Sequence, residues 1–157
     1  MKPRAYQAIL LGGLIAGTLD ITYACVFSYV RSGRTPLLVL QAVASGALGR
    51  SAYDGGAKTA ALGLSFHFLI ALIAATIYYL ASRGLRFMIA QAVICGILYG
   101  VFVYAVMNCV VLRLSAIHWT TWPWSYPKSA LIGGLLIHMF GIGLPIALAV
   151  RWGSRER

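Results

Sequence analysis

Four stretches of this chain are apolar over lengths that can cross a lipid bilayer, and this property limits the fold more than any other. A helical span needs about 20 mostly apolar residues, and inside lipid every backbone polar group must be hydrogen-bonded within the protein. Continuous apolar runs favour helices, because the strands of a membrane barrel alternate in polarity. The sequence therefore predicts an all-α membrane bundle in one domain, residues 1–157, with transmembrane helices at about 5–30, 57–82, 87–112 and 129–150.

The composition excludes a soluble protein. Charged residues make up 10% of the chain, whereas a soluble domain carries about 25%. The net charge of +10 comes from Lys and Arg residues at the ends of the apolar stretches, a pattern typical of contact with anionic lipids. We therefore expect membrane lipids, and not nucleic acid, as partners. The three cysteines show no CxxC spacing that would indicate a metal site.

The basic residues also predict an orientation. Four helices place both chain ends on one side of the membrane, and basic residues are slightly more numerous on that side. Because Lys and Arg concentrate in cytoplasmic loops, we expect both termini in the cytoplasm. The basic residues on the side of the termini are Lys2, Arg4, Arg83, Arg86, Arg151, Arg155 and Arg157, and those on the other side are Arg31, Arg34, Arg50, Lys58, Arg113 and Lys128.

The first connection is expected to contain a shorter helix. Thr35 is a suitable N-cap residue and Pro36 suits the first helical position. Apolar residues then recur at helical spacing to about residue 48. The segment 36–48 is too short to span a bilayer, so we expect it to lie in the interface or to enter the membrane as a re-entrant element.

The third connection, SAIHWTTWPWSYPK, is rich in aromatic residues. Amphipathic rings settle at the level of the lipid headgroups. We interpret Trp119, Trp122, Trp124 and Tyr126 as interface anchors, and a ligand-binding aromatic box is the alternative.

Each predicted transmembrane helix carries small residues at helical spacing. Gly13 and Gly17 form a G-x-x-x-G pattern in the first helix, and such patterns let two membrane helices approach closely. The corresponding packing residues in the other three helices are Gly63, Gly96, Gly100, Gly134 and Gly141.

Polar side chains share these small-residue faces. Asp20 follows Gly13 and Gly17 on one face of the first helix, so it should point into the bundle, where ionisable residues of membrane proteins are normally found. Counted from the ends of the spans, the depths of Asp20, His67, Tyr104 and His138 agree within roughly 8 Å, and Asn108 follows Tyr104 by one helical turn on the same face. The sequence therefore predicts a polar layer near mid-membrane that contains Asp20, His67, Tyr104, Asn108 and His138.

Two interpretations of this layer stay open. Polar groups in membrane bundles often stabilise packing, by about 0.6 kcal/mol on average, and this interpretation suits Tyr104 and Asn108 best. A functional role is the default for Asp20, because placing a carboxylate in a membrane is costly. An Asp–His pair is chemically suited to passing protons.

Three segments of the chain resemble a known family. GLIAG in the first helix, GLSFHFLIALIAATIYYL in the second and WPW before the fourth are similar to the YagU-like family of small bacterial inner-membrane proteins. The first connection and the tail differ from the family pattern. The resemblance implies a bacterial inner membrane and a role in acid tolerance, and it brings no catalytic motif. The residues that carry it are Gly13, Gly17, His67, Trp122, Pro123, Trp124 and His138.

Three functions are compatible with these patterns. The first is a non-enzymatic membrane protein that handles protons or a small solute through the polar layer. The second is a structural or accessory subunit that packs against a larger membrane complex or another copy of itself. The third is a haem protein with His67 and His138 as axial ligands. Because the sequence has no catalytic triad spacing, acidic metal cluster or phosphate loop, we expect no catalytic residue, no metal site and no cofactor other than this haem.

Overall fold

The computed structural model describes residues 3–154, and this part of the chain is helical without any strand. Four helical spans are long and apolar enough to cross a membrane, which confirms the predicted all-α class. Lys2, Arg155 and Arg157, which entered the charge count, lie outside the described residues. The spans are α1 (Pro3–Ser32), α3 (Gly56–Gly84), a third that joins α5 (Ala92–Val106), η2 (Met107–Val111) and α6 (Leu112–Leu114), and a fourth that joins α7 (Lys128–Leu136), η4 (Ile137–Gly143) and α8 (Leu144–Ser154).

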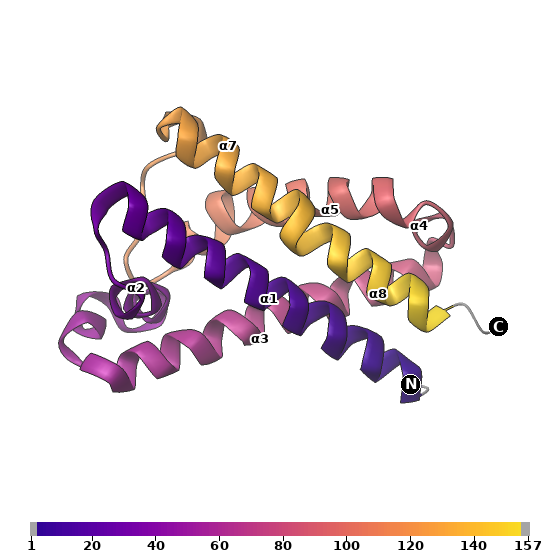
Figure 1. Cartoon of the computed structure of the whole chain (residues 1–157), viewed down its shortest axis with the longest axis horizontal. Coiled ribbons are helices and arrows are strands. Elements are labelled where there is room, and N and C mark those ends of the chain that lie inside the picture. The colour runs from indigo at the N-terminus through magenta and orange to yellow at the C-terminus, as the bar shows by residue number, and fades with distance from the viewer. Residues whose placement is uncertain (1–2, 155–157) are drawn as a thin grey trace.

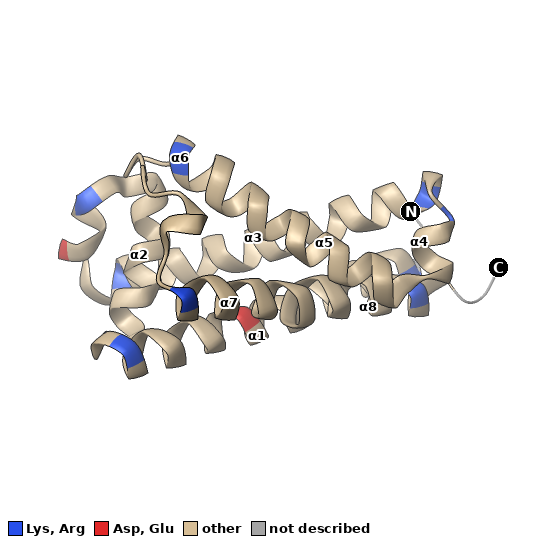
Figure 2. Cartoon of the chain, turned by 90° about the horizontal axis from the view of Figure 1, so that it is seen from above, with Lys and Arg blue, Asp and Glu red and all other residues tan. Residues whose placement is uncertain are grey.

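Large apolar side chains are exposed along all four spans. Leu14, Leu80, Leu98 and Phe140 are examples, each about half exposed or more. Lys and Arg residues gather near the two ends of the long helices (Figure 2). An apolar surface between two charged ends matches the hydrocarbon core and headgroup regions of a bilayer.

The short helix α2 (Pro36–Leu48) begins and ends where the sequence predicts, and η1 (Gly49–Asp54) follows it. The hydroxyl of Thr35 accepts a hydrogen bond from the Leu38 backbone N–H at 3.5 Å, which caps the helix. Figure 1 shows α2 nearly end-on, so it lies across the direction of the long helices. It occupies the end of the bundle opposite to the start of α1 and the end of α8.

The four spans do not form a closed ring. α1 packs against α3 on one side and against η4 and α8 on the other, and α5 packs against η4 and α8. α3 and α5 contact each other near Tyr78 and Tyr99, whose rings meet edge-to-face at 5.0 Å. From there the two helices diverge toward the end that holds α2 (Figure 1).

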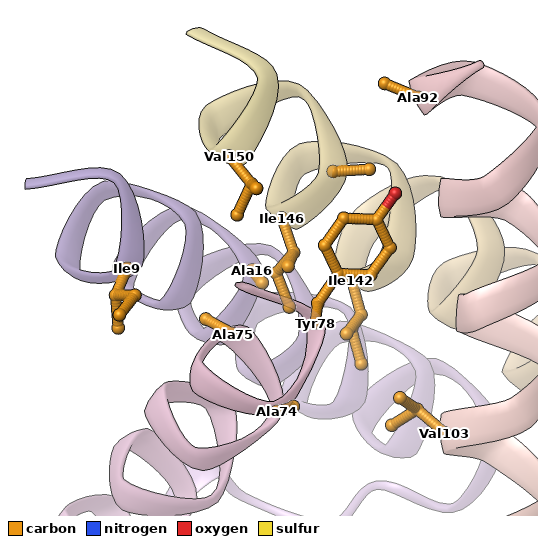
Figure 3. Close-up of a cluster of buried hydrophobic side chains, with 11 residues drawn as sticks. Ile9, Ala16, Ala74, Ala75, Tyr78, Ala92, Val103, Ile142, Ile146 and Val150 are labelled. Atoms are coloured by element: carbon orange, nitrogen blue, oxygen red, sulfur yellow. The ribbon is translucent and has the colours of Figure 1, made fainter. Parts of the chain in front are cut away.

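The apolar core fills the half of the bundle where α3 and α5 meet. Its buried side chains surround Tyr78, and Figure 3 shows them converging from α1, α3, α5 and the fourth span. The Tyr78 hydroxyl donates to the Met88 carbonyl at 3.1 Å, and the Tyr99 hydroxyl donates to the Ala74 carbonyl at 2.7 Å. We call this region the closed half; its core consists of Ile9, Ala16, Ala74, Ala75, Tyr78, Ala92, Val103, Ile142, Ile146, Ala147 and Val150.

The third span starts later than predicted. The sequence predicts one helix from residue 87, but α4 (Phe87–Ala90) ends at Gln91, whose backbone leaves the helical region at φ −104° and ψ 43°. A new helix starts at Ala92. The hydrogen bond from Tyr78 to Met88 ties α4 to α3, so tertiary packing accompanies a break that hydropathy does not reveal.

Two π-helical segments interrupt the third and fourth spans. They are η2 (Met107–Val111) and η4 (Ile137–Gly143). The sequence treats both spans as regular α-helices, with Gly134, His138 and Gly141 on one face. The π turns change this spacing, since each π turn holds more residues than an α turn.

Glycines bring two helix pairs into close contact. A Cβ atom on Gly100 would overlap the backbone carbonyl of His138, and one on Gly63 would overlap the carbonyl of Leu40 in α2. Gly143, which was not among the predicted packing residues, lies against the backbones of Gly96 and Gly100. Only a residue without a side chain allows these backbones to approach so closely.

The other predicted packing glycines face side chains. A Cβ atom on Gly13 or Gly17 would meet Leu72 or Phe68 of α3 at 2.8 Å. Gly134 lies beside the ring of Tyr104, and Gly141 faces Ile137 of its own span.

Candidate functional site

A cavity of about 790 Å³ occupies the half of the bundle where α3 and α5 diverge. Side chains of α3 line one wall and those of α5, η2 and α6 line the other. α1 and η4 contribute residues between these walls, and α2 and the start of the third connection close the end. Ala16, Ala74, Val103 and Ile142 belong to both the cavity lining and the core, so the cavity begins where the core of the closed half ends. We call the region around this cavity the open half.

The lining is mostly apolar, with a few polar side chains. Four of the five predicted polar-layer residues contribute to it, namely Asp20, His67, Asn108 and His138. Several apolar lining residues, among them Leu69, Val110 and Leu114, keep about half or more of their surface exposed. The cavity therefore communicates with the bundle surface between α3 and the third span.

Asp20 lies near the middle of α1 and is half-buried against the cavity. Its neighbours in the lining include Ala16, Gly17 and Ala24 on the same helix. Within residues 3–154 its carboxylate makes no hydrogen bond or ion pair. It interacts electrostatically with Tyr23 and with His138 across the bundle.

His67 connects α3 to α1. Its Nε2 lies 2.8 Å from the Gly17 carbonyl oxygen. A carbonyl oxygen can only accept, so Nε2 donates, and in the neutral ring Nδ1 is left as an acceptor. The ring also packs edge-to-face against Phe68, at 5.6 Å between centroids.

His138 lies at the start of the π-helical segment η4 and interacts electrostatically with His67 as well as with Asp20. Its Nδ1 donates to the carbonyl oxygen of Gly134, one turn earlier, at 2.8 Å. Nε2 is therefore the acceptor in the neutral ring. π segments occur often at functional sites, and η2 and η4 each contribute a polar residue to the cavity, Asn108 and His138 respectively.

Tyr104 stands apart from the other four residues. It is 8% exposed and does not line the cavity. Its ring packs edge-to-face against His138 at 5.2 Å between centroids. Its buried hydroxyl has no hydrogen-bond partner among the described residues. The predicted layer is thus not a single set of cavity residues, because depth along a helix does not determine the face on which a side chain lies.

Asn108 belongs to a hydrogen-bond chain that holds the third connection. Its amide nitrogen donates to the Tyr104 carbonyl at 2.9 Å, and its amide oxygen accepts from the Tyr126 hydroxyl at 3.2 Å. The indole N–H of Trp119 donates to Tyr126 at 3.0 Å. This arrangement supports the structural interpretation of Asn108.

The four aromatic residues predicted as interface anchors lie in this same connection, at the end of the bundle that holds α2. Trp119, Trp122 and Trp124 are exposed, and Tyr126 is half-buried. Trp122 stacks on Trp124 at 4.6 Å, and the guanidinium of Arg113 lies 3.4 Å from the centre of the Trp122 ring.

One buried polar residue that holds α2 in place was not predicted from the sequence. Gln41 of α2 is 1% exposed, and its amide donates to the Gly56 carbonyl at 3.1 Å and to the Thr59 hydroxyl at 3.3 Å. The backbone N–H of Ala116 donates to the Gly46 carbonyl at 2.8 Å. These contacts fix α2 to α3 and to the third connection. The signal that could have revealed this role is a single glutamine among the apolar residues of the segment 36–48.

Metal and haem sites have limited support from these residues. No group of three His, Cys, Asp or Glu side chains suited to a metal ion occurs in the described part of the chain. Among the two candidate haem ligands, His138 keeps Nε2 free, whereas Nε2 of His67 is bonded to the Gly17 carbonyl. Ligation by both rings through Nε2 would require that bond to break.

The comparisons with known proteins do not extend this description: no family model, no curated protein and no solved structure matches the chain.

Proposed function

We propose that this chain is a non-enzymatic multi-pass protein of the bacterial inner membrane that holds a small, largely apolar solute in the cavity of its open half. The observation that carries this proposal is the cavity itself, about 790 Å³ in volume and lined mainly by apolar residues. Sites for small molecules have such volumes and such linings, with a few polar groups that orient the ligand.

The polar lining gives this solute site a chemical character. His138 interacts electrostatically with Asp20 and with His67, and all three residues line the mainly apolar cavity. Ionisable side chains inside a membrane are rare and commonly mark solute or proton pathways. Proton exchange by these three residues accompanies solute binding in our proposal.

The bundle also offers the solute a route from the lipid. α3 and α5 make little contact outside the region of Tyr78 and Tyr99. Exposed lining residues such as Leu69 on α3 and Val110 on η2 flank the gap. An apolar solute dissolved in the bilayer can enter sideways between these helices.

Photolabelling in lipid nanodiscs tests the proposal. An apolar alkyl diazirine should label cavity residues of α3 and η2 saturably, with the labelled peptides identified by mass spectrometry. Gly46→Leu should reduce this labelling, because Gly46 lines the cavity and a Cβ atom there meets only Ser115, at 3.8 Å. The new side chain then fills cavity space without displacing backbone.

Gly84→Leu is the matched control, since a Cβ atom at Gly84 meets nothing within 4 Å and Gly84 does not line the cavity. We expect this variant to label like the wild type. Labelling that is spread evenly over lipid-facing residues, and that Gly46→Leu leaves unchanged, would contradict the proposed site.

The proposed orientation has both termini in the cytoplasm. A chain in which Cys25, Cys95 and Cys109 are replaced can carry one new cysteine at Ser125, in η3 (Pro123–Ser125), or at Ser154, at the end of α8. With an impermeant thiol reagent added outside intact cells, Ser125→Cys should react and Ser154→Cys should not. The reverse pattern would overturn the orientation and leave the four helices in place.

A further inference from the structure

The polar part of the cavity is rich in hydrogen-bond acceptors. His67 uses its N–H on the Gly17 carbonyl, and His138 uses its N–H on the Gly134 carbonyl. Each neutral ring therefore keeps one nitrogen that can only accept. Because backbone carbonyls hold both hydrogens, the two rings cannot exchange donor and acceptor without losing these bonds.

Asp20 adds the strongest acceptor of the three. An ionised carboxylate only accepts hydrogen bonds, and no donor or cation contacts it among residues 3–154. The described cavity lining contains neither Lys nor Arg, although the chain as a whole has a net charge of +10. A carboxylate in so apolar a setting is costly unless a positive charge accompanies it.

The other polar residues of the lining offer few donors. Ser115 donates its hydroxyl hydrogen to the Leu112 carbonyl at 2.6 Å. Asn108 is bonded through both its nitrogen and its oxygen, which leaves it one amide hydrogen. Hydrogen-bond acceptors therefore outnumber free donors in the described lining, and the site favours a ligand that supplies donors and positive charge.

We propose that the solute is a protonated amine on an apolar chain, whose ammonium group donates to Asp20 and to the free ring nitrogens of His67 and His138. This inference rests on the proposed solute site and names its ligand class. An ammonium group has three hydrogens and no acceptor, so it complements three acceptors. The apolar chain lies against the aliphatic walls supplied by α3 and η2.

Two sources can supply this chemistry. One is a free amphipathic amine dissolved in the bilayer, and the other is a membrane lipid whose headgroup ends in an ammonium, such as phosphatidylethanolamine. Both reach the cavity through the lateral gap between α3 and the third span.

Competition against the photolabel tests the ligand class. Decylamine, decanol and decanoate share one chain length, and each is titrated against the alkyl diazirine in nanodiscs of phosphatidylglycerol, a lipid without an amine. Decylamine should compete at concentrations about tenfold lower than decanol, as expected for a hydrogen-bonded charge pair. Decanoate should compete least, because its charge repels Asp20.

Variants of Asp20 separate recognition of the amine from its partitioning into lipid, since partitioning is the same for every protein variant. Asp20→Asn should bring the decylamine and decanol curves together and leave competition by decanol unchanged. Asp20→Glu keeps the carboxylate and should retain the preference. Nanodiscs that contain phosphatidylethanolamine distinguish the two sources: weaker labelling than in phosphatidylglycerol identifies the lipid, and equal labelling identifies the free amine.

The two proposals fail in different ways. If the diazirine labels the cavity but decylamine and decanol compete equally in the wild type, the amine is wrong and the solute site stands. A preference that survives unchanged in Asp20→Asn also overturns the amine proposal. If no saturable cavity labelling occurs at all, the solute site itself is wrong.

Discussion

In the closed half α3 and α5 meet at Tyr78 and Tyr99, whereas in the open half the same two helices are separated by a cavity. The tyrosine hydroxyls of the closed half donate to backbone carbonyls, so that half combines apolar packing with satisfied polar groups. The open half contains an unpaired carboxylate among its described residues. The same chain therefore combines a packed, hydrogen-bonded half with a half whose cavity is lined by ionisable side chains.

The largest expected difference in stability between the halves comes from replacing one glycine by alanine in each half. Gly143→Ala places a Cβ atom against the backbones of Gly96 and Gly100, which cannot rotate away as a side chain can. Overpacking of this kind costs about 1–3 kcal/mol, and contact with backbone favours the upper end of that range. The thermal unfolding temperature in detergent should fall clearly.

Gly46→Ala is the counterpart in the open half. Its Cβ atom meets only Ser115, at 3.8 Å, in the last turn of helix α2. Alanine in a helix interior is more favourable than glycine by about 0.5–1 kcal/mol, and the gain is smaller in a last turn, so the unfolding temperature should stay level or rise slightly. Equal destabilisation by both substitutions would mean that the open half is packed as tightly as the closed half.

Much of this architecture follows from the sequence. Hydropathy predicts the four spans, and Thr35 with Pro36 predicts the start of α2. These features are local, because a bilayer or a cap acts on one segment at a time. The sequence also singles out Asp20, His67 and His138, since polar side chains in apolar runs are conspicuous, but whether they act in function stays a prediction.

The packing of the helices against one another could not be predicted in the same way. Apolar runs do not reveal that α3 and α5 diverge, and lipid can cover whatever surface is left unpaired. Hydropathy also does not reveal the break at Gln91 or the π segments η2 and η4. Without the arrangement of the helices, the sequence placed Tyr104 and His138 in one layer. In the structure the Tyr104 ring packs against the His138 ring, but only His138 lines the cavity.

A smaller difference is expected from removing one hydroxyl in each half. Tyr99→Phe loses the hydrogen bond to the Ala74 carbonyl, which joins α5 to α3. Hydrogen bonds between membrane helices contribute about 0.6 kcal/mol on average and at most about 1.7 kcal/mol. Tyr104→Phe removes a buried hydroxyl that has no partner among the described residues, so it should be neutral or slightly stabilising. Chemical denaturation of the two variants in the same detergent measures the difference, and a greater loss in Tyr104→Phe would show that its hydroxyl has a partner.

The smallest effect on stability is expected from substitutions of Asp20. These variants should change ligand preference while leaving the unfolding temperature nearly unchanged. Asp20→Leu removes a carboxylate that bonds to nothing among residues 3–154, so no partner is left unsatisfied. An apolar side chain also avoids the cost of desolvating a carboxylate that has no counter-ion. The unfolding temperature of Asp20→Leu should therefore equal or slightly exceed that of the wild type, and Asp20→Asn should remain close to it.

Both Asp20 variants should nevertheless lose the preference for decylamine over decanol, because neither carries the charge that attracts an ammonium group. Melting curves and competition curves from the same preparation make this comparison. A clear fall in the unfolding temperature of Asp20→Leu, reversed in Asp20→Asn, would mean that the carboxylate serves as a hydrogen-bonding strut between helices. Wild-type stability and wild-type amine preference in Asp20→Leu would leave the carboxylate with neither role, and the open half would then bind by its apolar walls alone.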